Sequence, residues 1–367
     1  MRLLTLTLFL SLFNLALAQL PPETSTTATL PAWQPHWVFV LDSNFPYLTA
    51  NKATLLDGDR LDMLGMISMG YLANLEVSPD GKEVYAIETF HSRLTRGERT
   101  DVVTIYDAKT LLPVGEIPIP AKRFLVVTKR NVTGLTADGR FLLVYNYTPG
   151  QSVSVVDLKA RRFVGEIETP GCALVYPTGP RQFVMICADG ALLGVSLDDN
   201  GRVRSQNRSP QIFNPDEDPV FEHAVTLGNR LYLVSYKGKV YEVDGSGIPP
   251  RLLRTFALPE EGFRPGGWQL LSAHPNGFLY VLVHQGGDWT HKYPGEEVWV
   301  INLREGRRVD RIRLVEPANS IYVTQDGRPL LFALSEHGFV QVYGAFSGRY
   351  QGRIDEIGVS PFVLIGR

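Results

Sequence analysis

The sequence predicts an all-β fold, a seven-bladed β-propeller, and three observations carry that prediction. A unit consisting of a tight turn followed by short apolar strands recurs six times along the chain. Its turn glycines stand 40 to 58 residues apart, at positions 81, 139, 179, 228, 277 and 327. The two ends of the chain carry the parts of one further unit. Repeats of this length, made of short strands and Gly-containing turns, are typical of propeller blades.

The clearest copy of the unit begins at the turn Val77–Lys82 and continues into three predicted strands. These strands are the apolar runs Val84–Ile87, Val102–Asp107 and Val114–Ile117. The second copy repeats this order, with its turn at Leu135–Gly139 and strands at Phe141–Tyr145, Val153–Asp157 and Phe163–Ile167. Asp-Gly and Asn-Gly turns tolerate positive φ and join antiparallel strands tightly. Strands rich in Val, Ile, Tyr and Phe suit a sheet that is covered on both faces.

The ends of the chain predict how the ring closes. The last strand, Val359–Ile365, has the character of a first strand whose partners are missing. Near the start, His36–Asp42 and Leu64–Ile67 have the character of later strands without a first one. Pairing of these N- and C-terminal strands completes a seventh blade and removes two free sheet edges. Blade boundaries can shift by a few residues, so six or eight blades stay open at this point.

The chain of 367 residues divides into three predicted segments. Residues 1–18 have the pattern of a cleavable secretory signal peptide, with Arg2, an apolar stretch and a small-residue cleavage site. Residues 19–35 are rich in Pro and Thr and are expected to form a flexible arm. Residues 36–367 form the propeller domain. The sequence therefore predicts an exported protein, in which the two cysteines, Cys172 and Cys187, form a disulfide.

The net charge of −2 argues against nucleic acid or an anionic membrane as the main partner. No catalytic constellation is specific, and we predict no metal site and no cofactor in this chain. His284 and His291 are candidate metal ligands in one polar segment, but a solvated connecting loop is the stronger interpretation. The cysteine pair lacks the CxxC spacing of a redox or metal site.

Two segments carry more charge and aromatic character than a bare scaffold needs. One is the inter-strand loop His91–Asp101, with Arg93, Arg96 and Arg99, which is either solvated or ordered by ion pairs for docking a partner. The other is Gly262–Gln269, where Arg264 and Trp268 stand in a Gly-rich turn. Arg and Trp are frequent at interface hot spots. These five side chains are the candidate partner interface.

The chain resembles the heavy (large) subunit of methylamine dehydrogenase and aromatic amine dehydrogenase. The similarity runs in register from about Trp37 to Leu364. The segments that carry it are Arg93–Pro113, Arg123–Val126, Cys172–Gly190, Arg264–Gln269, Trp289–Lys292 and Pro329–Ser335.

The resemblance implies a periplasmic propeller that pairs with a light subunit in a heterotetramer. In this family the light subunit carries tryptophan tryptophylquinone, and the heavy subunit contributes no base or cofactor. A primary amine becomes an aldehyde and ammonia, and the electrons pass to a blue copper protein (cupredoxin) such as amicyanin or azurin, or to a c-type cytochrome. The preferred amine and the acceptor stay open, as does the tetramer geometry, because the Pro/Thr-rich arm differs from the helical arm of well-known members.

The resemblance also assigns one substrate-channel residue. The family places a Phe in a Gly-x-aromatic-Leu-like context at the inner end of the substrate channel, and Met69–Leu72 matches it with Tyr71. Ordinary packing beneath the partner is the alternative role for Tyr71. Two other functions remain in competition: a non-catalytic periplasmic scaffold that binds proteins, and a propeller hydrolase such as a lactonase with a central metal. The hydrolase needs carboxylates or histidines from several blades at the axis, and the sequence offers no such set.

Overall fold

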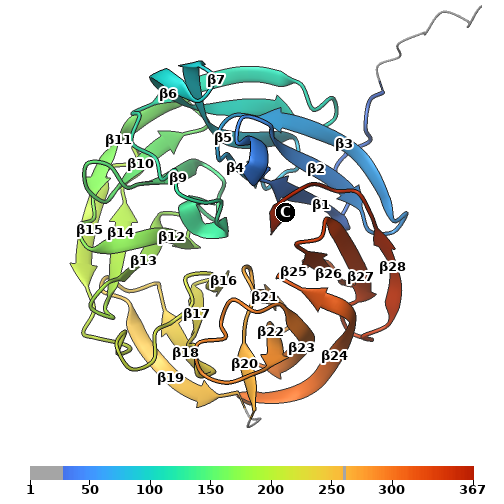
Figure 1. Cartoon of the computed structure of the whole chain (residues 1–367). Coiled ribbons are helices and arrows are strands. Elements are labelled where there is room, and N and C mark those ends of the chain that lie inside the picture. Colours follow the sequence, from blue (N-terminus) through green and yellow to red (C-terminus); the bar gives the residue numbers. More distant parts are fainter. Residues whose placement is uncertain (1–27, 259–261) are drawn as a thin grey trace, which may run out of the picture.

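Seven small antiparallel sheets surround a central axis in the computed structural model, as Figure 1 shows. The structure describes residues 28–258 and 262–367. The predicted seven-bladed, all-β propeller is thereby confirmed. The predicted signal peptide, residues 1–18, and the first part of the predicted arm lie outside the described residues.

Blades 1 to 3 follow the first three turns of the repeat. Blade 1 contains β4 (Asn74–Val77), β5 (Glu83–Arg93), β6 (Arg96–Asp107) and β7 (Pro113–Ile119). Blade 2 contains β8 (Thr133–Leu135), β9 (Phe141–Asn146), β10 (Ser152–Asp157) and β11 (Arg162–Glu168), preceded by the short helix η2 (Arg130–Val132). Blade 3 contains β12 (Cys172–Gly179), β13 (Gln182–Cys187), β14 (Leu192–Leu197) and β15 (Val203–Arg208).

Blades 4 to 6 follow the last three turns. Blade 4 contains β16 (Val225–Leu227), β17 (Arg230–Val234), β18 (Lys239–Asp244) and β19 (Arg251–Ala257). Blade 5 contains β20 (Phe263–Pro265), β21 (Leu271–His274), β22 (Phe278–Gln285), β23 (Gly295–Asn302) and β24 (Arg307–Ala318). Blade 6 contains β25 (Ser320–Val323), β26 (Leu330–Ser335), β27 (Phe339–Gly344) and β28 (Tyr350–Ile354).

Blade 7 is assembled from both ends of the chain. It contains β29 (Pro361–Ile365), β1 (Trp37–Asp42), β2 (Asn51–Asp57) and β3 (Asp62–Met69), with the short helix η1 (Phe45–Tyr47) between β1 and β2. The last strand pairs antiparallel with the first, from Phe39 opposite Ile365 to Leu41 opposite Val363. This is the closure that the sequence predicted, and it pairs two strand edges that would otherwise be free.

The core lies between the blades, because the middle strands are covered on both faces by neighbouring sheets. All six residues of β9, β10 and β14 are buried, in keeping with their nearly continuous apolar sequences. The outermost strands face solvent, and every residue of β15 is exposed. The blades are therefore held together by apolar packing between sheets.

The described part of the predicted arm, residues 28–35, lies against blades 7 and 1. The Leu30 amide donates a hydrogen bond to the Lys109 carbonyl at 2.8 Å. The Trp33 ring packs 5.8 Å from that of Trp37, measured between centroids. No helix in the described ranges is long and apolar enough to cross a membrane.

Candidate functional site

The two faces of the propeller are formed by different connections. In each blade the first-to-second and third-to-fourth strand turns lie on one side, which we call the turn face. The second-to-third strand loops and the connections between blades lie on the other side, which we call the loop face. The loop face is turned towards the viewer in Figure 1, where η1 and η2 lie in front of the strands. Tyr71 and the five candidate interface residues all lie on the loop face.

Tyr71 stands in the short connection from β3 to β4, and its backbone is held on several sides. Its amide donates to the Thr89 carbonyl at 2.8 Å, and the preceding Gly70 amide donates to Glu88 Oε1 at 2.9 Å. A Cβ at Gly70 would stand 2.7 Å from the Thr89 carbonyl oxygen, so this position requires glycine. The Tyr71 ring is half-buried and meets His91 edge-on, at 5.8 Å between centroids.

Arg123 anchors this turn from the connection between blades 1 and 2. Its buried guanidinium donates to the carbonyls of Leu72 at 2.6 Å and Tyr71 at 3.2 Å, and also to that of Ile87 at 3.1 Å. The Arg123 amide donates to Asp101 Oδ2 at 3.2 Å. Burial lowers the pKa of Arg123 to about 10, against the attraction of Asp101, so the guanidinium is charged at neutral pH. Arg123 therefore ties the Tyr71 turn to β5 through its side chain and to β6 through its amide.

The segment predicted as an inter-strand loop, residues 91–101, is instead a β-ribbon. Strands β5 and β6 continue to Arg93 and Arg96, which pair with each other across a two-residue turn. At its base, Arg99 binds Asp101 with two hydrogen bonds, at 2.8 and 2.6 Å. Arg93 and Arg96 are exposed, and neither forms an ion pair with another described residue. The sequence suggested a loop here because Gly97 was the only turn residue in the segment, and nothing else marked where two long strands would meet.

Trp268 lies close to the axis, in the connection that precedes β21. Its indole N–H donates to the Thr128 carbonyl at 3.0 Å, and its ring stands 5.6 Å from that of Phe362. The His223 ring meets it edge-on at 5.5 Å, and His223 Nδ1 bonds the Trp268 carbonyl. Arg264 lies further out, where it pairs with Asp288 at 3.3 Å. The structure thus separates Arg264 from Trp268, although both stay on the loop face.

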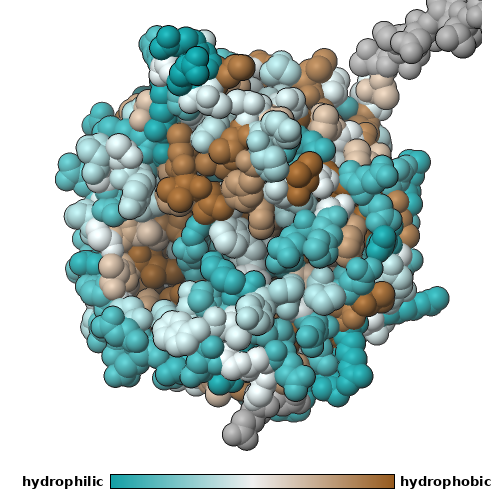
Figure 2. Space-filling model, in the orientation of Figure 1, coloured by the Kyte–Doolittle hydropathy of each residue, from teal (hydrophilic) through white to brown (hydrophobic). Residues whose placement is uncertain are grey.

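Large apolar side chains are exposed across the loop face. Figure 2 shows hydrophobic surface gathered over part of this face, bordered by hydrophilic residues. Trp289, at the tip of the loop after β22, is 72% exposed, and Leu94 at the ribbon tip is 79% exposed. The other exposed members are Phe45, Tyr47, Phe90, Val126, Tyr147, Tyr293 and Val359. Exposed apolar clusters of this kind mark protein interaction surfaces.

The disulfide predicted between Cys172 and Cys187 is present. The two cysteines stand directly opposite each other on β12 and β13, at the loop-face end of blade 3. Both are buried, and they help to line a mainly apolar cavity of about 370 Å³ beside Tyr147 and Phe213. The bridge therefore fixes one wall of a hollow on the loop face.

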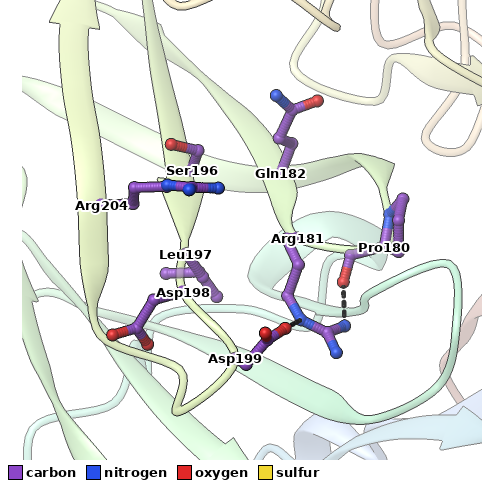
Figure 3. A pocket seen from close by; sticks show the side chains of 8 residues that line it. All are labelled: Pro180, Arg181, Gln182, Ser196, Leu197, Asp198, Asp199 and Arg204. Atoms are coloured by element: carbon purple, nitrogen blue, oxygen red, sulfur yellow. Dashed lines mark hydrogen bonds and ion pairs between the residues drawn. The ribbon is translucent and has the colours of Figure 1, made fainter.

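A second cavity, of about 420 Å³, lies on the turn face of blade 3 and is shown in Figure 3. Its polar wall is organised around Arg181, which pairs with Asp199 at 3.5 Å and also binds Asp138 of blade 2. These contacts serve the packing of two adjacent blades. The cavity holds none of the residues that the sequence predicted for function.

The two histidines considered as metal ligands have other contacts. His284 is buried in β22, not in a loop, and its Nε2 lies 2.7 Å from Thr290 Oγ1. His291 stacks on Tyr236 at 4.1 Å between centroids. Across residues 28–258 and 262–367, no group of three or more His, Cys, Asp or Glu side chains is placed to hold a metal ion.

Comparison with known proteins decides the family. The family model described as methylamine dehydrogenase heavy chain (MADH) matches residues 35–366. The chain belongs to the methylamine dehydrogenase heavy chain family. The heavy chain of Methylophilus methylotrophus is 33% identical over 95% of this chain and 87% of its own length. That of Paracoccus versutus is 33% identical over 91% of this chain and 80% of its own length.

Membership in this family makes the chain a subunit of an amine dehydrogenase complex. Solved structures of lower identity share the fold alone. Dihydro-heme d1 dehydrogenase NirN superposes with a TM-score of 0.55 at 19% identity, over 95% of this chain and 78% of its own. Apo AztD from Citrobacter koseri gives 0.56 at 15% identity, over 90% of this chain and 97% of its own.

Several loop-face residues of this heavy-chain family member were missed as site candidates by sequence reasoning. Arg123, Val126 and Trp289 entered only through the resemblance, and Tyr47 and Tyr147 were not singled out. Each lies in a connection that follows a second or fourth strand of a blade. Large aromatic or apolar residues at those places in the repeat are the signal that could have found all of them except Arg123.

Proposed function

We propose that this chain is the heavy subunit of a periplasmic amine dehydrogenase, and that it docks a separate light subunit on its loop face. The light subunit would carry tryptophan tryptophylquinone, which accepts two electrons from the amine. A primary amine then loses two electrons and two protons at its C–N unit, and water supplies the aldehyde oxygen as ammonia leaves. The electrons pass on to a cupredoxin or a c-type cytochrome.

The observation that carries this proposal is the apolar surface around Tyr71 in a chain of this family. Exposed aromatic side chains gain most when a partner buries them, and Trp and Tyr dominate interface hot spots. Tyr71 is half-buried at the edge of this surface; its carbonyl is bound by Arg123, and the preceding Gly70 amide donates to Glu88. A docked light subunit would complete a channel in which this ring meets the side chain of the incoming amine.

The residues of this chain would bind the light subunit and shape the substrate channel, and none of them would transfer protons. Tyr71 would present bulk and apolar surface, and its hydroxyl would seek a partner at the channel wall. Export to the periplasm rests on the signal-like residues 1–18 and is supported by the disulfide, because disulfides persist in oxidising compartments.

The direct test is to produce the chain with and without a light subunit of this enzyme class. Alone, the chain should fold, lack quinone absorbance and oxidise no amine. Together, the two should copurify and reduce a dye when a primary amine is added. Amine oxidation by the isolated chain would refute the subunit assignment, whereas failure to associate would favour a non-catalytic binding scaffold.

A matched pair of variants tests the docking face. Trp289→Ala on the loop face should weaken light-subunit binding by about 2 kcal/mol, the size of an interface hot spot. Phe346→Ala is the control, because Phe346 is an exposed aromatic residue, 46% accessible, on the turn face. Binding is measured by titrating labelled light subunit with each variant. Equal losses in the two variants would place the interface elsewhere.

A further inference from the structure

Two lysine side chains from different blades meet at one aromatic ring beside the axis. Lys292, from the loop after β22, places its Nζ 4.7 Å from the centroid of Trp268. Lys129, from the connection between blades 1 and 2, places its Nζ 5.6 Å from the same centroid. An ammonium over an indole is attracted by the ring quadrupole, and this attraction does not neutralise its charge.

The charge of this group is not balanced within the described chain. Lys129 forms an ion pair with Glu222. Lys292 forms no ion pair with any carboxylate of residues 28–258 and 262–367. The nearby Arg130 is already matched by buried Glu76 at 2.7 Å. The positive charge of Lys292 therefore has no carboxylate partner among the described residues.

Both ammonium groups are partly desolvated, and this lowers their pKa values. Burial, with added repulsion from Lys292, lowers the pKa of Lys129 to about 8. Burial also lowers the pKa of Lys292. A negative charge bound between these two ammonium groups would favour their charged forms and raise both pKa values.

A small cavity adjoins Lys292, and one of the side chains that line it has a buried polar atom without a partner. Its volume is about 120 Å³, and it is lined by residues that include Glu222, His223, Tyr236, Trp268 and Lys292, so that the carboxylate paired with Lys129 forms part of its wall. His223 is only 4% exposed, and its Nε2 has no hydrogen-bond partner, while Nδ1 bonds the Trp268 carbonyl. A buried polar atom without a partner is costly, and such atoms in native structures call for an explanation.

We propose that this cavity is a carboxylate-binding site, with Lys292 and Lys129 supplying the charge and Trp268 and Tyr236 supplying the walls. A carboxylate would pair with the unmatched Lys292 and share Lys129 with Glu222. Its charge would also favour protonation of His223 Nε2, which could then donate a hydrogen bond to it. Burial otherwise holds this imidazole neutral, with its pKa lowered to about 3. The carboxylate has two sources, a free small acid or an acidic residue of the docked light subunit.

The first experiment uses the isolated chain and therefore does not depend on the proposed function. Acetate is titrated at constant ionic strength while the tryptophan indole N–H signals are followed by NMR. The chain has five tryptophans, and Trp268→Phe assigns the relevant signal. A free-acid site predicts that acetate shifts the Trp268 signal and leaves that of exposed Trp289 in place. Lys292→Met should abolish this response, and Lys292→Arg, which retains the charge, should keep it.

The second experiment uses the complex and rests on the proposed function. If the carboxylate comes from the light subunit, Lys292→Met should weaken its binding about ten- to a hundredfold, the usual range for a charged hydrogen bond. Lys237→Met is the matched control, because Lys237 is an exposed lysine on the same face, in the loop after β17. Lys292→Arg should restore most of the binding.

The outcomes separate the two proposals. A response in either experiment that is specific to Lys292 supports the site and identifies its source. No acetate response, together with equal light-subunit binding by Lys292→Met and Lys237→Met, overturns it while leaving the subunit function intact. If the wild-type chain binds no light subunit, the proposed function fails, and the acetate titration alone decides on the site.

Discussion

The turn face and the loop face are built at opposite ends of the same strands, yet they satisfy their polar groups in different ways. On the turn face, the repeated turns are closed internally. Hydroxyls donate to a carboxylate two residues on at 2.7 to 2.8 Å, as in Ser78 to Asp80, Thr136 to Asp138 and Thr324 to Asp326. Such side-chain turns need no partner and repeat from blade to blade.

On the loop face, the connections differ in length and sequence and rely on long-range anchors. Arg123 donates hydrogen bonds to carbonyls of two other segments, and the Trp268 indole donates to the Thr128 carbonyl across the axis. The side chains of Trp289 and Leu94 stay largely exposed, because the rest of the chain does not bury them. The contrast indicates that the repeated turns and strands form the scaffold, whereas the connections on the loop face, which do not repeat, form the candidate site.

The largest difference between the faces should appear when a buried and a surface arginine are removed. Arg123→Met strands the carbonyls of Tyr71, Leu72 and Ile87 and leaves the buried Asp101 with less positive charge nearby. The expected loss in the free energy of unfolding is about 3–5 kcal/mol. Arg60→Met, on the turn face, should cost about 0–1 kcal/mol, because Arg60 and its ion-pair partner Asp62 are both largely exposed. Urea unfolding of the isolated chain measures both, and similar losses would contradict the comparison.

The next effect concerns the disulfide at the loop-face end of blade 3. Replacing Cys172 and Cys187 together by alanine should lower the free energy of unfolding by about 3 kcal/mol, given a sequence separation of 15 residues. Reductant should destabilise the wild-type chain and leave the double variant unaffected. Mass spectrometry of the non-reduced protein should show one linked peptide, and two free thiols there would contradict the prediction.

The fold could be predicted largely because the turn face is periodic. Glycines at 81 and 139 adopt φ of +68° and +67°, as a tight turn after an Asp requires, and they set the repeat. Asp107 and Asp157 end two of the predicted strands, and both accept backbone N–H groups of the turns that follow. Blade closure followed from strand character at the two ends of the chain.

The candidate site could be predicted only in part, because its geometry depends on contacts that have no local pattern. Tyr71 was placed through the resemblance, but its anchor Arg123 lies 52 residues later and acts on backbone carbonyls. The meeting of Lys129, Lys292 and Trp268 joins three connections, of which that holding Lys129 is far from the other two in the sequence. Only the folded ring of blades brings such residues together, and no periodicity in the sequence predicts their contact.

Substrate selection should be sensitive to Tyr71 and insensitive to an aromatic residue of the other face. Tyr71→Ala in the assembled complex should change the ratio of kcat/KM for methylamine and tyramine by about 1–3 kcal/mol, the range for altered apolar pocket contacts. Tyr350→Ala is the control, because Tyr350 is partly exposed, at 40%, near the turn-face end of blade 6. If both kcat/KM values change by the same factor in Tyr71→Ala, the ring only packs beneath the partner.

The smallest expected effect tests how the turns of the turn face satisfy their own polar groups. Asp107 Oδ1 accepts hydrogen bonds from the amides of Thr110 at 2.8 Å and Lys109 at 3.0 Å. The Thr110 amide is the main cause that holds the pKa of Asp107 below its usual value. A folded-state pKa below the unfolded value means that the added stability is present above about pH 4 and is lost as pH falls through the folded pKa.

Asp107→Asn keeps an accepting oxygen at this turn but removes the charge that strengthens its hydrogen bonds. The variant should therefore be about 1 kcal/mol less stable than the wild-type chain at pH 7. The gap should shrink on acidification, because the wild-type carboxylate is then protonated as well. Chemical unfolding of both proteins at neutral pH and below pH 4 measures the gap. A gap that stays constant would mean that the charge of Asp107 does not contribute, and that the geometry of the turn alone closes this face.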